Sequence, residues 1–281
     1  MPLSAPSVVI EELRKGTHMD EPDEDLARAT IESDGSIAQT KAVAKCTRCL
    51  TLPESECVLA EYVPVYRFGR LSSAQAVTVS INPAENKPGS KSLPVLSDFN
   101  CGSRIELTDD HIAMVSEGCN SYFEGDDPHD FFSDIEQVAV GLNAEWTYAS
   151  GKLAHIDAVA CVTRPIWSGI RPAALRRTIA EKCSFHFKST LRLIPSGCWL
   201  LCDGRTVLDT VQRAGVVMTL RGSVHGKKKE VEIYTGSFAK DGRTLKVIGW
   251  NWPAHTHTIY PVIQPQKVGE AVKAVLQGIG W

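Results

Sequence analysis

The chain has 281 residues, 43% of them hydrophobic, and a formal net charge of −3 at pH 7. This length and apolar content can support one large buried core, and the net charge argues against binding to nucleic acid through overall basicity. No secretory leader and no apolar run of membrane-spanning length occurs, so we expect a cytoplasmic protein without a membrane partner. Nine cysteines in that compartment are typical of thiols or metal ligands rather than disulfides.

The first 45 residues differ in composition from the rest of the chain. They are poor in aromatic residues and rich in acids, among them Glu11, Glu12, Asp20, Glu21, Asp23, Glu24 and Asp25. This composition disfavours stable burial. We therefore expect residues 1–45 to form an acidic, flexible arm and residues 46–281 to form a single α/β domain.

Basic residues gather at two places in the remaining, more basic body. One group surrounds a predicted helix and the other is a short run: Arg171, Arg176, Arg177, Lys182, Lys188 and Arg192, and then Lys227, Lys228 and Lys229. Such clusters can neutralise the phosphates of DNA. A solvated charged face is the alternative interpretation of the same residues.

The first strong strand signal is the β-branched run over 77–81, which Asn82-Pro83 ends abruptly. Because α/β enzymes bind ligands beyond the carboxyl ends of such strands, Asn82 is a candidate functional residue, with a simple turn as the alternative. The later elements are predicted in this order: helices over 108–115 and 130–142, a strand over 154–162, a helix over 172–193, a strand and turn over 196–204, a helix over 205–213, an edge strand or hairpin at 231–234, a strand over 245–250 and a helix over 268–276. Strands that alternate with helices predict a three-layer αβα fold around a central, mainly parallel sheet.

Four motifs in this order resemble those of the uracil-DNA glycosylase superfamily. They are Ser80-Ile81-Asn82-Pro83, the segment from His155 to Pro165, Leu200-Leu201-Cys202-Asp203-Gly204-Arg205, and Pro253-Ala254-His255-Thr256-His257. The resemblance covers the chain from about Val77 to its end. In the last motif the family usually has His-Pro-Ser-Pro, whereas this chain has His-Thr-His-Thr, which leaves open which of the two histidines acts.

The resemblance implies a monofunctional DNA glycosylase, which flips a base out of DNA and hydrolyses its N-glycosidic bond to leave an abasic site. In the family the motif asparagine orients the attacking water, which implies this role for Asn82. A histidine on the opposite loop stabilises the departing anionic base, which implies His255 or His257. Ile81 and Pro83 would line the base pocket beside the asparagine. No lysine occupies the motif positions, so no Schiff base is expected.

The resemblance also implies how the base is recognised. Phe99 follows the first motif at a distance like that of the family's stacking phenylalanine, with core packing as the alternative. Asp157 stands where uracil-specific members have asparagine, and an ionised carboxylate only accepts hydrogen bonds, which suits an exocyclic amino group such as that of cytosine. A cap or an ion pair is the alternative role for Asp157. Ile259 or Tyr260 would wedge into the gap that the flipped nucleotide leaves.

A glycosylase directed at cytosine has to spare the ordinary base. This requirement favours a modified cytosine, such as the glucosylated hydroxymethylcytosine of phage DNA, and a role in antiviral defence. A repair glycosylase for uracil or another deaminated base is one alternative, and a non-catalytic DNA-binding module of the same fold is another. We expect DNA as the partner and a monomeric chain.

A cysteine motif, Cys46-Thr47-Arg48-Cys49, precedes Cys161 and Cys183 in an order similar to the iron–sulfur branch of the same superfamily. Four thiolates at these positions would hold a [4Fe–4S] cluster. Zinc bound by Cys46, Cys49, Cys57 and one further ligand is the alternative. The hydrolysis of a glycosidic bond itself requires no cofactor.

Motifs of three other enzyme classes are missing from the sequence. It has no Gly-x4-Gly-Lys-Ser/Thr loop for nucleoside triphosphates, no Gly-x-Ser-x-Gly elbow, and no His-x-Glu with Pro-Cys-x-x-Cys of a zinc deaminase. These absences disfavour those classes, whereas a hydrolase that removes bases needs none of the three motifs.

Overall fold

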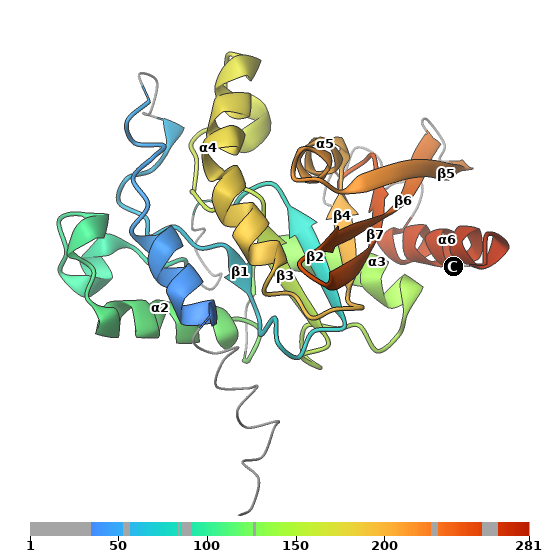
Figure 1. Cartoon of the computed structure of the whole chain (residues 1–281), viewed down its shortest axis with the longest axis horizontal. Helices are drawn as coiled ribbons and strands as arrows, with labels where there is room; N and C mark the ends of the chain where they lie inside the picture. The colour runs from blue at the N-terminus through green and yellow to red at the C-terminus, as the bar shows by residue number, and fades with distance from the viewer. Residues whose placement is uncertain are drawn as a thin grey trace, which may run out of the picture.

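The computed structural model describes residues 35–52, 57–83, 85, 92–125, 128–225, 230–254 and 264–280. They form a seven-stranded sheet with helices on both of its faces (Figure 1). The predicted mixed α/β class is therefore confirmed, and the arrangement is compatible with three layers. Among the described helices, none has the length and apolar character that a bilayer-spanning segment requires.

The sheet combines a parallel centre with antiparallel edges. Its strand order is β1-β3-β2-β4-β7-β6-β5, with bounds Arg67–Phe68 (β1), Ala76–Ser80 (β2), Leu153–Asp157 (β3), Trp199–Asp203 (β4), Val217–His225 (β5), Glu230–Lys240 (β6) and Arg243–Trp250 (β7). The four central strands β3, β2, β4 and β7 run parallel. β1 pairs antiparallel at one edge, and β6 and β5 form an antiparallel hairpin at the other. The predicted short strand at 231–234 is thus part of a longer hairpin.

The central strands are short and buried on both faces. All residues of β2 and β3 are buried, as expected for parallel strands that helices cover on both sides. The predicted strand over 154–162 ends as a regular strand at Asp157, but its backbone pairing continues on both sides. Ala158 N and Val159 N donate to Ser80 O (3.0 Å) and Ile81 O (2.8 Å), and the 57–65 segment pairs with it antiparallel through Val65 N to Ala160 O (3.1 Å) and Leu59 N to Val162 O (3.1 Å). Within this segment Val159 and Cys161 pack in a third apolar cluster, which also contains Cys49 and Cys183.

Five helices follow one another along the chain: α2 (Asp109–Asn120), α3 (Phe131–Leu142), α4 (Ala173–Leu191), α5 (Arg205–Arg213) and α6 (Pro265–Gly278). α3 and α6 share a core cluster with Leu201 of β4, whereas α4 and α5 share another with its neighbour Leu200. Because neighbouring strand residues point to opposite faces, the two helix pairs cover the two sides of the sheet. A helix over residues 35–44 precedes them and lies beside α4, where Gln39 Nε2 donates to His186 O (3.0 Å).

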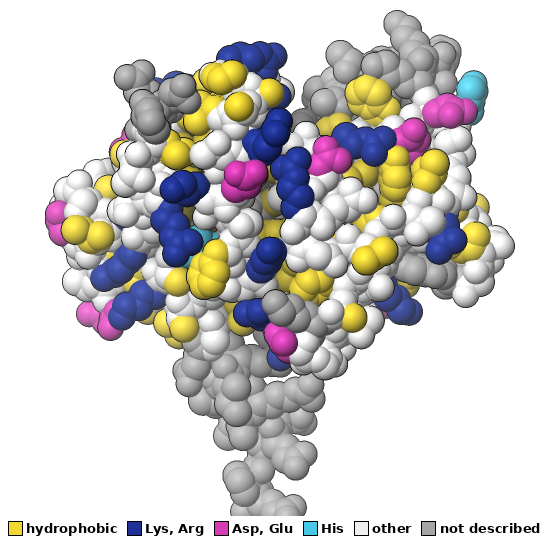
Figure 2. All heavy atoms as spheres, turned by 45° about the horizontal axis from the view of Figure 1, so that its top comes forward, with side chains coloured by type: hydrophobic (Ala, Val, Ile, Leu, Met, Phe, Trp, Pro, Cys, Tyr) yellow, Lys and Arg dark blue, Asp and Glu magenta, His cyan; other side chains and the backbone are white. Residues whose placement is uncertain are grey.

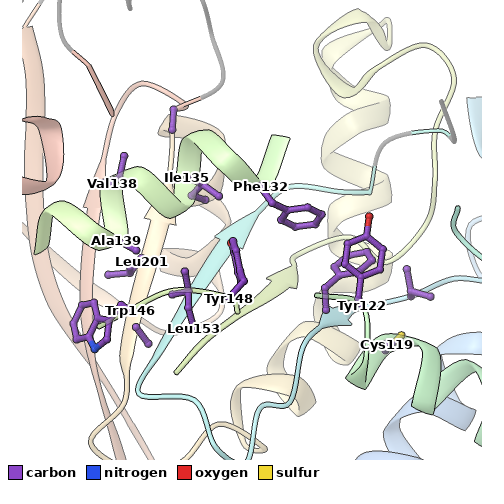
Figure 3. Close-up of a cluster of buried hydrophobic side chains, with 14 of the residues drawn as sticks. Cys119, Tyr122, Phe132, Ile135, Val138, Ala139, Trp146, Tyr148, Leu153 and Leu201 are labelled. Atoms are coloured by element: carbon purple, nitrogen blue, oxygen red, sulfur yellow. The ribbon is translucent and has the colours of Figure 1, made fainter. Parts of the chain in front are cut away.

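α3 follows the predicted helical spacing. Ile135, Val138 and Leu142 are buried as that spacing indicates, but Phe132 rather than Phe131 is the deeply buried aromatic residue. Figure 3 shows Phe132, Ile135 and Val138 of α3 in the same cluster as Leu201 of the sheet. The helix therefore forms one wall of the larger core.

α3 and α6 cross closely at two glycines, Gly141 and Gly269. A Cβ atom built on Gly141 would lie 2.9 Å from the Gly269 Cα and would overlap the Gln266 carbonyl oxygen. Such a contact is incompatible with real Cβ packing, so the glycines set the distance between the two helices. This crossing holds α6 against the sheet.

We expect Gly141→Ala to lower the free energy of unfolding by about 1–3 kcal/mol through overpacking, although alanine alone favours a helix by about 1 kcal/mol over glycine. Gly118→Ala in α2 is the matched control, because no atom lies within 4 Å of its added methyl group. The control should stabilise the protein slightly. Urea unfolding measures both changes, and an equal stabilisation by the two substitutions would contradict the tight crossing.

Candidate functional site

The site lies where the order of the parallel strands reverses. β2 connects to β3 on one side, and the chain then returns to form β4 on the other side of β2. In open α/β sheets ligands bind beyond the carboxyl ends of the strands at such a switch point. Here the register aligns Ser80 with Asp157 and Val79 with Cys202, so the ends of all three strands meet.

Asn82 follows the end of β2 and is half-buried. Its Nδ2 donates to Thr163 Oγ1 (3.1 Å), Pro83 O (3.1 Å) and Cys161 O (3.4 Å). These bonds hold the amide plane against the segment that follows β3. The side-chain Oδ1 makes no hydrogen bond to any other described residue, so it is available as an acceptor for a ligand or a water molecule.

A buried chain of polar side chains crosses from β2 to β3 beside Asn82. Ser80 Oγ donates to Asp157 Oδ1, and His155 Nε2 lies 3.2 Å from Ser80 Oγ and 3.4 Å from Asp157 Oδ1. On the other side of the ring, Thr78 Oγ1 is 2.7 Å from His155 Nδ1 and 2.7 Å from the Tyr148 hydroxyl. The five side chains therefore form one network that ends at Asp157.

This network differs from a hydrolytic serine–histidine–aspartate triad. In a triad one imidazole nitrogen contacts the nucleophile and the other contacts the carboxylate. Here the same nitrogen, His155 Nε2, faces both Ser80 and Asp157, and Nδ1 faces Thr78. Asp157 is only 3% exposed, so the arrangement suits a carboxylate held in place rather than an activated nucleophile.

Sequence reasoning identified Asp157 but missed its partners in the network, Thr78, Ser80, His155 and Tyr148. The signal lay in the two strands. Thr78 and Ser80 alternate with apolar residues in β2, and His155 and Asp157 do the same in β3. Because alternate strand residues share a face, both pairs had to lie on the same side of the sheet once β2 and β3 were paired.

Asp203 at the end of β4 anchors the start of the predicted histidine loop. Its Oδ1 accepts from Trp250 Nε1 (2.7 Å) and from Ala254 N (2.7 Å). Gly204 has φ 96°, and a Cβ there would lie 2.7 Å from Pro253 Cγ, so the Asp-Gly pair also fits against the turn before this loop. Seven predicted residues lie outside the described residues: His255 and His257 of the loop, Ile259 and Tyr260 after it, and the lysine run 227–229.

The other predicted residues lie in several environments. Ile81 is half-buried between two core clusters, and Pro83 is buried. Phe99 is half-buried in a short 3-10 turn (Leu96–Phe99) with its ring 5.2 Å from that of His111 in α2. This packing agrees with the core alternative for Phe99, and the structure assigns it no contact with Asn82.

The basic residues before and within α4 use some of their donors within the protein. Arg171 donates to Ser168 O (2.6 Å), and Arg176 donates to Ile170 O (2.5 Å). Arg171 is exposed and Arg176 is half-buried. Figure 2 shows lysine and arginine side chains spread over the middle of one face, with acidic side chains between some of them.

Three of the four predicted metal-ligating cysteines come together in the fold. Cys49 follows the first helix, Cys161 follows β3, and Cys183 belongs to α4, yet their sulfur atoms all lie within 4.8 Å of one another. The sulfurs of Cys49 and Cys183 are 3.9 Å apart. All three side chains are buried, whereas Cys46 and Cys57 are half-buried.

Charge is distributed unequally among these thiols. Hydrogen bonds from Cys183 and Cys49 hold the pKa of the Cys161 thiol well below its usual range, and the Arg104 guanidinium adds to this effect. The hydrogen bond to Cys161 contributes most to raising the pKa of the Cys49 thiol to about 12, and burial adds to the effect. These contacts therefore favour negative charge on Cys161 over Cys49.

The three buried thiols would supply three of the four thiolates that zinc or a [4Fe–4S] cluster accepts. Cys46, the predicted fourth ligand on the same CxxC motif as Cys49, is half-buried and its sulfur lies outside this group of three. Two thiolates bound tetrahedrally to zinc at about 2.3 Å are about 3.8 Å apart. The separation of the Cys49 and Cys183 sulfurs is close to that value.

None of the protein-family models, curated proteins and solved structures with which the chain was compared matches it. The family resemblance of the four motifs therefore stays a prediction.

Arg104 is the buried cation that joins the cysteine cluster to its surroundings. It is 2% exposed and donates to the carbonyl oxygens of Tyr62 (3.0 Å), Leu59 (2.9 Å) and Cys46 (3.0 Å). Its Nη1 also lies 3.9 Å from Cys161 Sγ. This one side chain therefore satisfies three backbone carbonyls and faces the Cys161 sulfur.

We expect Arg104→Met to lower the free energy of unfolding by at least about 3 kcal/mol, because each buried acceptor left without a partner costs about 1–3 kcal/mol. Arg70→Met is the control, since Arg70 forms only exposed ion pairs with Glu117 and Glu124, and such pairs contribute about 0–1 kcal/mol. Denaturant unfolding measures both losses. Similar losses for the two substitutions would show that the buried guanidinium has no special role.

Proposed function

We propose that the chain is a monofunctional DNA glycosylase that removes a modified cytosine by hydrolysing its N-glycosidic bond. The observation that carries the proposal is the geometry of Asn82 at the switch point of the sheet. Its amide nitrogen is held by Thr163 and by the Cys161 carbonyl, and its Oδ1 is left as an acceptor. A carboxylate, Asp157, ends the neighbouring strand.

The hydrolysis needs a positioned water and support for the departing base. Asn82 Oδ1 would accept a hydrogen bond from the water, which aims the water's oxygen at the anomeric carbon of the flipped nucleotide. As the new carbon–oxygen bond forms, the bond to the base breaks and its electron pair leaves with the base. The proton that the water loses would end on the departing base, through solvent, which leaves a hydroxyl group on the sugar and a neutral free base. A histidine of the loop, His255 or His257, would donate a hydrogen bond to the base as negative charge develops. Asp203 supports this role because it anchors the loop at Ala254.

Asp157 would select the base. Ser80 donates to its Oδ1, and His155 lies beside the same oxygen, so the carboxylate is held in one orientation. A carboxylate accepts hydrogen bonds and favours an exocyclic amino group over the carbonyl oxygen of uracil. Selection against ordinary cytosine would need a modified base, such as glucosylated hydroxymethylcytosine, and phage DNA is the source that this chemistry suggests.

DNA would approach across the carboxyl ends of the strands. Arg171 retains exposed surface beside the start of α4 and is a candidate for phosphate contact, as are Arg176 and the lysine run 227–229. Ile81 and Pro83 would contribute apolar surface to the base pocket, and Ile259 or Tyr260 would fill the gap in the duplex. A single chain in the cytoplasm suffices for this chemistry.

We also propose that Cys46, Cys49, Cys161 and Cys183 hold a metal. The order of these four cysteines along the chain favours a [4Fe–4S] cluster. The 3.9 Å between the Cys49 and Cys183 sulfurs makes zinc the second candidate. When bound, the metal supplies a cross-link and no step of the hydrolysis. The metal would join three parts of the chain: the loop after the first helix, the segment that follows β3, and helix α4. The segment that follows β3 also holds Asn82 by two hydrogen bonds.

We expect Asn82→Ala to reduce the release of base by at least about 100-fold through loss of a positioned water, with little change in DNA affinity. Mass spectrometry would measure free bases released from unmodified, uracil-containing, hydroxymethylated and glucosylated DNA. Asn143→Ala is the matched control, because Asn143 lies near Gln75 and Trp199 at the opposite ends of the strands. Release of uracil but of no cytosine derivative would contradict the assigned base, and no release from any DNA would favour a binding module.

The metal proposal predicts a stoichiometric amount of iron or zinc in the protein purified without oxygen. Serine at Cys49, Cys161 or Cys183 should lower the metal content strongly, because each removes a thiolate ligand. Cys198→Ser is the control, since Cys198 is equally buried but belongs to another core cluster. Elemental analysis decides the outcome, and a wild-type protein without either metal would refute the centre.

A further inference from the structure

The buried network that ends at Asp157 begins at Tyr148. Tyr148 is 6% exposed, and among the described residues its hydroxyl has one polar partner, Thr78 Oγ1, at 2.7 Å. Burial raises the pKa of Tyr148 well above its usual range, so the hydroxyl keeps its proton at neutral pH. A buried hydroxyl with a single partner gives its hydrogen to that partner, because an unpaired buried donor is costly. Tyr148 therefore donates to Thr78.

Thr78 in turn donates to His155. The Thr78 hydroxyl has one hydrogen and two acceptors within reach, His155 Nδ1 at 2.7 Å and the Ala154 carbonyl oxygen at 3.3 Å. The first distance is typical of a hydrogen bond from a hydroxyl, and the second is longer than usual. The hydrogen of Thr78 is therefore directed at Nδ1, which accepts it with its lone pair.

This contact selects one tautomer of His155. A neutral imidazole carries one ring hydrogen, so an Nδ1 that accepts leaves the hydrogen on Nε2. Nε2 lies 3.2 Å from Ser80 Oγ and 3.4 Å from Asp157 Oδ1, and both oxygens can accept. In the opposite tautomer the lone pair of Nε2 would face the carboxylate oxygen with no hydrogen between them, because Ser80 donates its own hydrogen to Asp157.

Aromatic rings surround the imidazole and leave its nitrogens to the network. His155 is 1% exposed, and the rings of Phe132 and Phe68 lie 5.0 and 5.9 Å from it between centroids. Phe132 also packs against Tyr148, at 5.6 Å between centroids (Figure 3). These phenyl rings offer no nitrogen or oxygen, so both imidazole nitrogens bond within the network.

The donors converge on one oxygen of Asp157. Oδ1 receives the hydrogen of Ser80 and faces the Nε2–H of His155, whereas Oδ2 accepts no hydrogen bond from any described residue. Two donors on the same oxygen fix the rotation of the carboxylate. Oδ2 is then the oxygen that a ligand can use.

We propose that this network fixes His155 as the Nε2–H tautomer and leaves Asp157 Oδ2 to accept from an amino group on the bound base. Tyr148, Thr78, Ser80 and His155 act through Asp157 and are positioning residues. The reading of the base rests on the proposed function. The tautomer is a property of the protein without DNA.

Nitrogen-15 NMR of the full-length protein, labelled at histidine, measures the tautomer of His155 at neutral pH. We expect two widely separated ring-nitrogen shifts, with the hydrogen on Nε2. Thr78→Val keeps the shape of the side chain and removes its hydroxyl, so it should move the Nδ1 shift, whereas Thr78→Ser should restore it. Thr235→Val is the matched control, because Thr235 is equally buried in the sheet but bonds Arg221 instead.

Substitutions at His155 test whether its donor matters for the base. His155→Gln can place an amide N–H where Nε2 lies, and it should keep the release of modified cytosine near the wild-type level. His155→Leu removes the donor and should lower that release by about 10- to 100-fold, the effect of one lost hydrogen bond to a charged group. Equal losses in the two variants would show that His155 has only a packing role.

Asp157→Asn tests the orientation that the network imposes. Because Ser80 and His155 both present hydrogens to Oδ1, an amide at this position would place its carbonyl oxygen there and its NH₂ group where Oδ2 lies. The variant would offer a donor to the base, so we expect its preference to change from an amino-bearing base to a carbonyl-bearing one such as uracil. Mass spectrometry of the bases released from glucosylated, hydroxymethylated and uracil-containing DNA measures the change.

Two results on the wild-type protein would overturn the inference. One is the Nδ1–H tautomer, and the other is a charged imidazolium with hydrogens on both nitrogens, which gives two similar shifts. An unchanged base preference in Asp157→Asn would refute the assignment of Oδ2 as the reading atom. The Nε2–H tautomer together with no base release from any DNA would refute the proposed glycosylase and leave the tautomer assignment standing.

Discussion

The parallel pairing of β2 with both β3 and β4 is the constraint on which the rest of the structure depends. This pairing brings three carboxyl ends to one edge of the sheet, and the register places Ser80 beside Asp157. A shift by one residue would turn the polar side chains of β2 toward α4 and α5 and would bury its valines against α3. The site therefore depends on a register that the two helix layers enforce by burying both faces.

The strand-end site and the cysteine cluster are parts of one arrangement. The segment from Ala158 to Thr163 continues from β3, carries Cys161, and accepts the hydrogen bonds of Asn82 at Cys161 O and Thr163 Oγ1. Arg104 holds the other side of the cluster through the Cys46 carbonyl. Because Asn82 Nδ2 donates to the Cys161 carbonyl and to Thr163 two residues later, a shift of Cys161 would move the side chain of Asn82.

The polar network inside the sheet has a cost in stability. Burying Asp157 and His155 removes them from water, and their bonds to Ser80 and Thr78 offset part of that loss, while Thr78 also bonds Tyr148. An apolar set of the same volume would pack at least as well. The proposed recognition of a base by Asp157 would account for such a network at the end of two parallel strands.

The sequence by itself determined the local features. The helical spacing at 131–142, the strand that ends at Asn82 and the CxxC motif all follow from short-range patterns, because helix and strand periods are properties of a few neighbouring residues. It could not determine that Cys49, Cys161 and Cys183 converge, that His155 lies between Thr78 and Asp157, or that Asp203 anchors Ala254. These contacts join residues far apart in the chain, and only strand order, register and helix packing decide them.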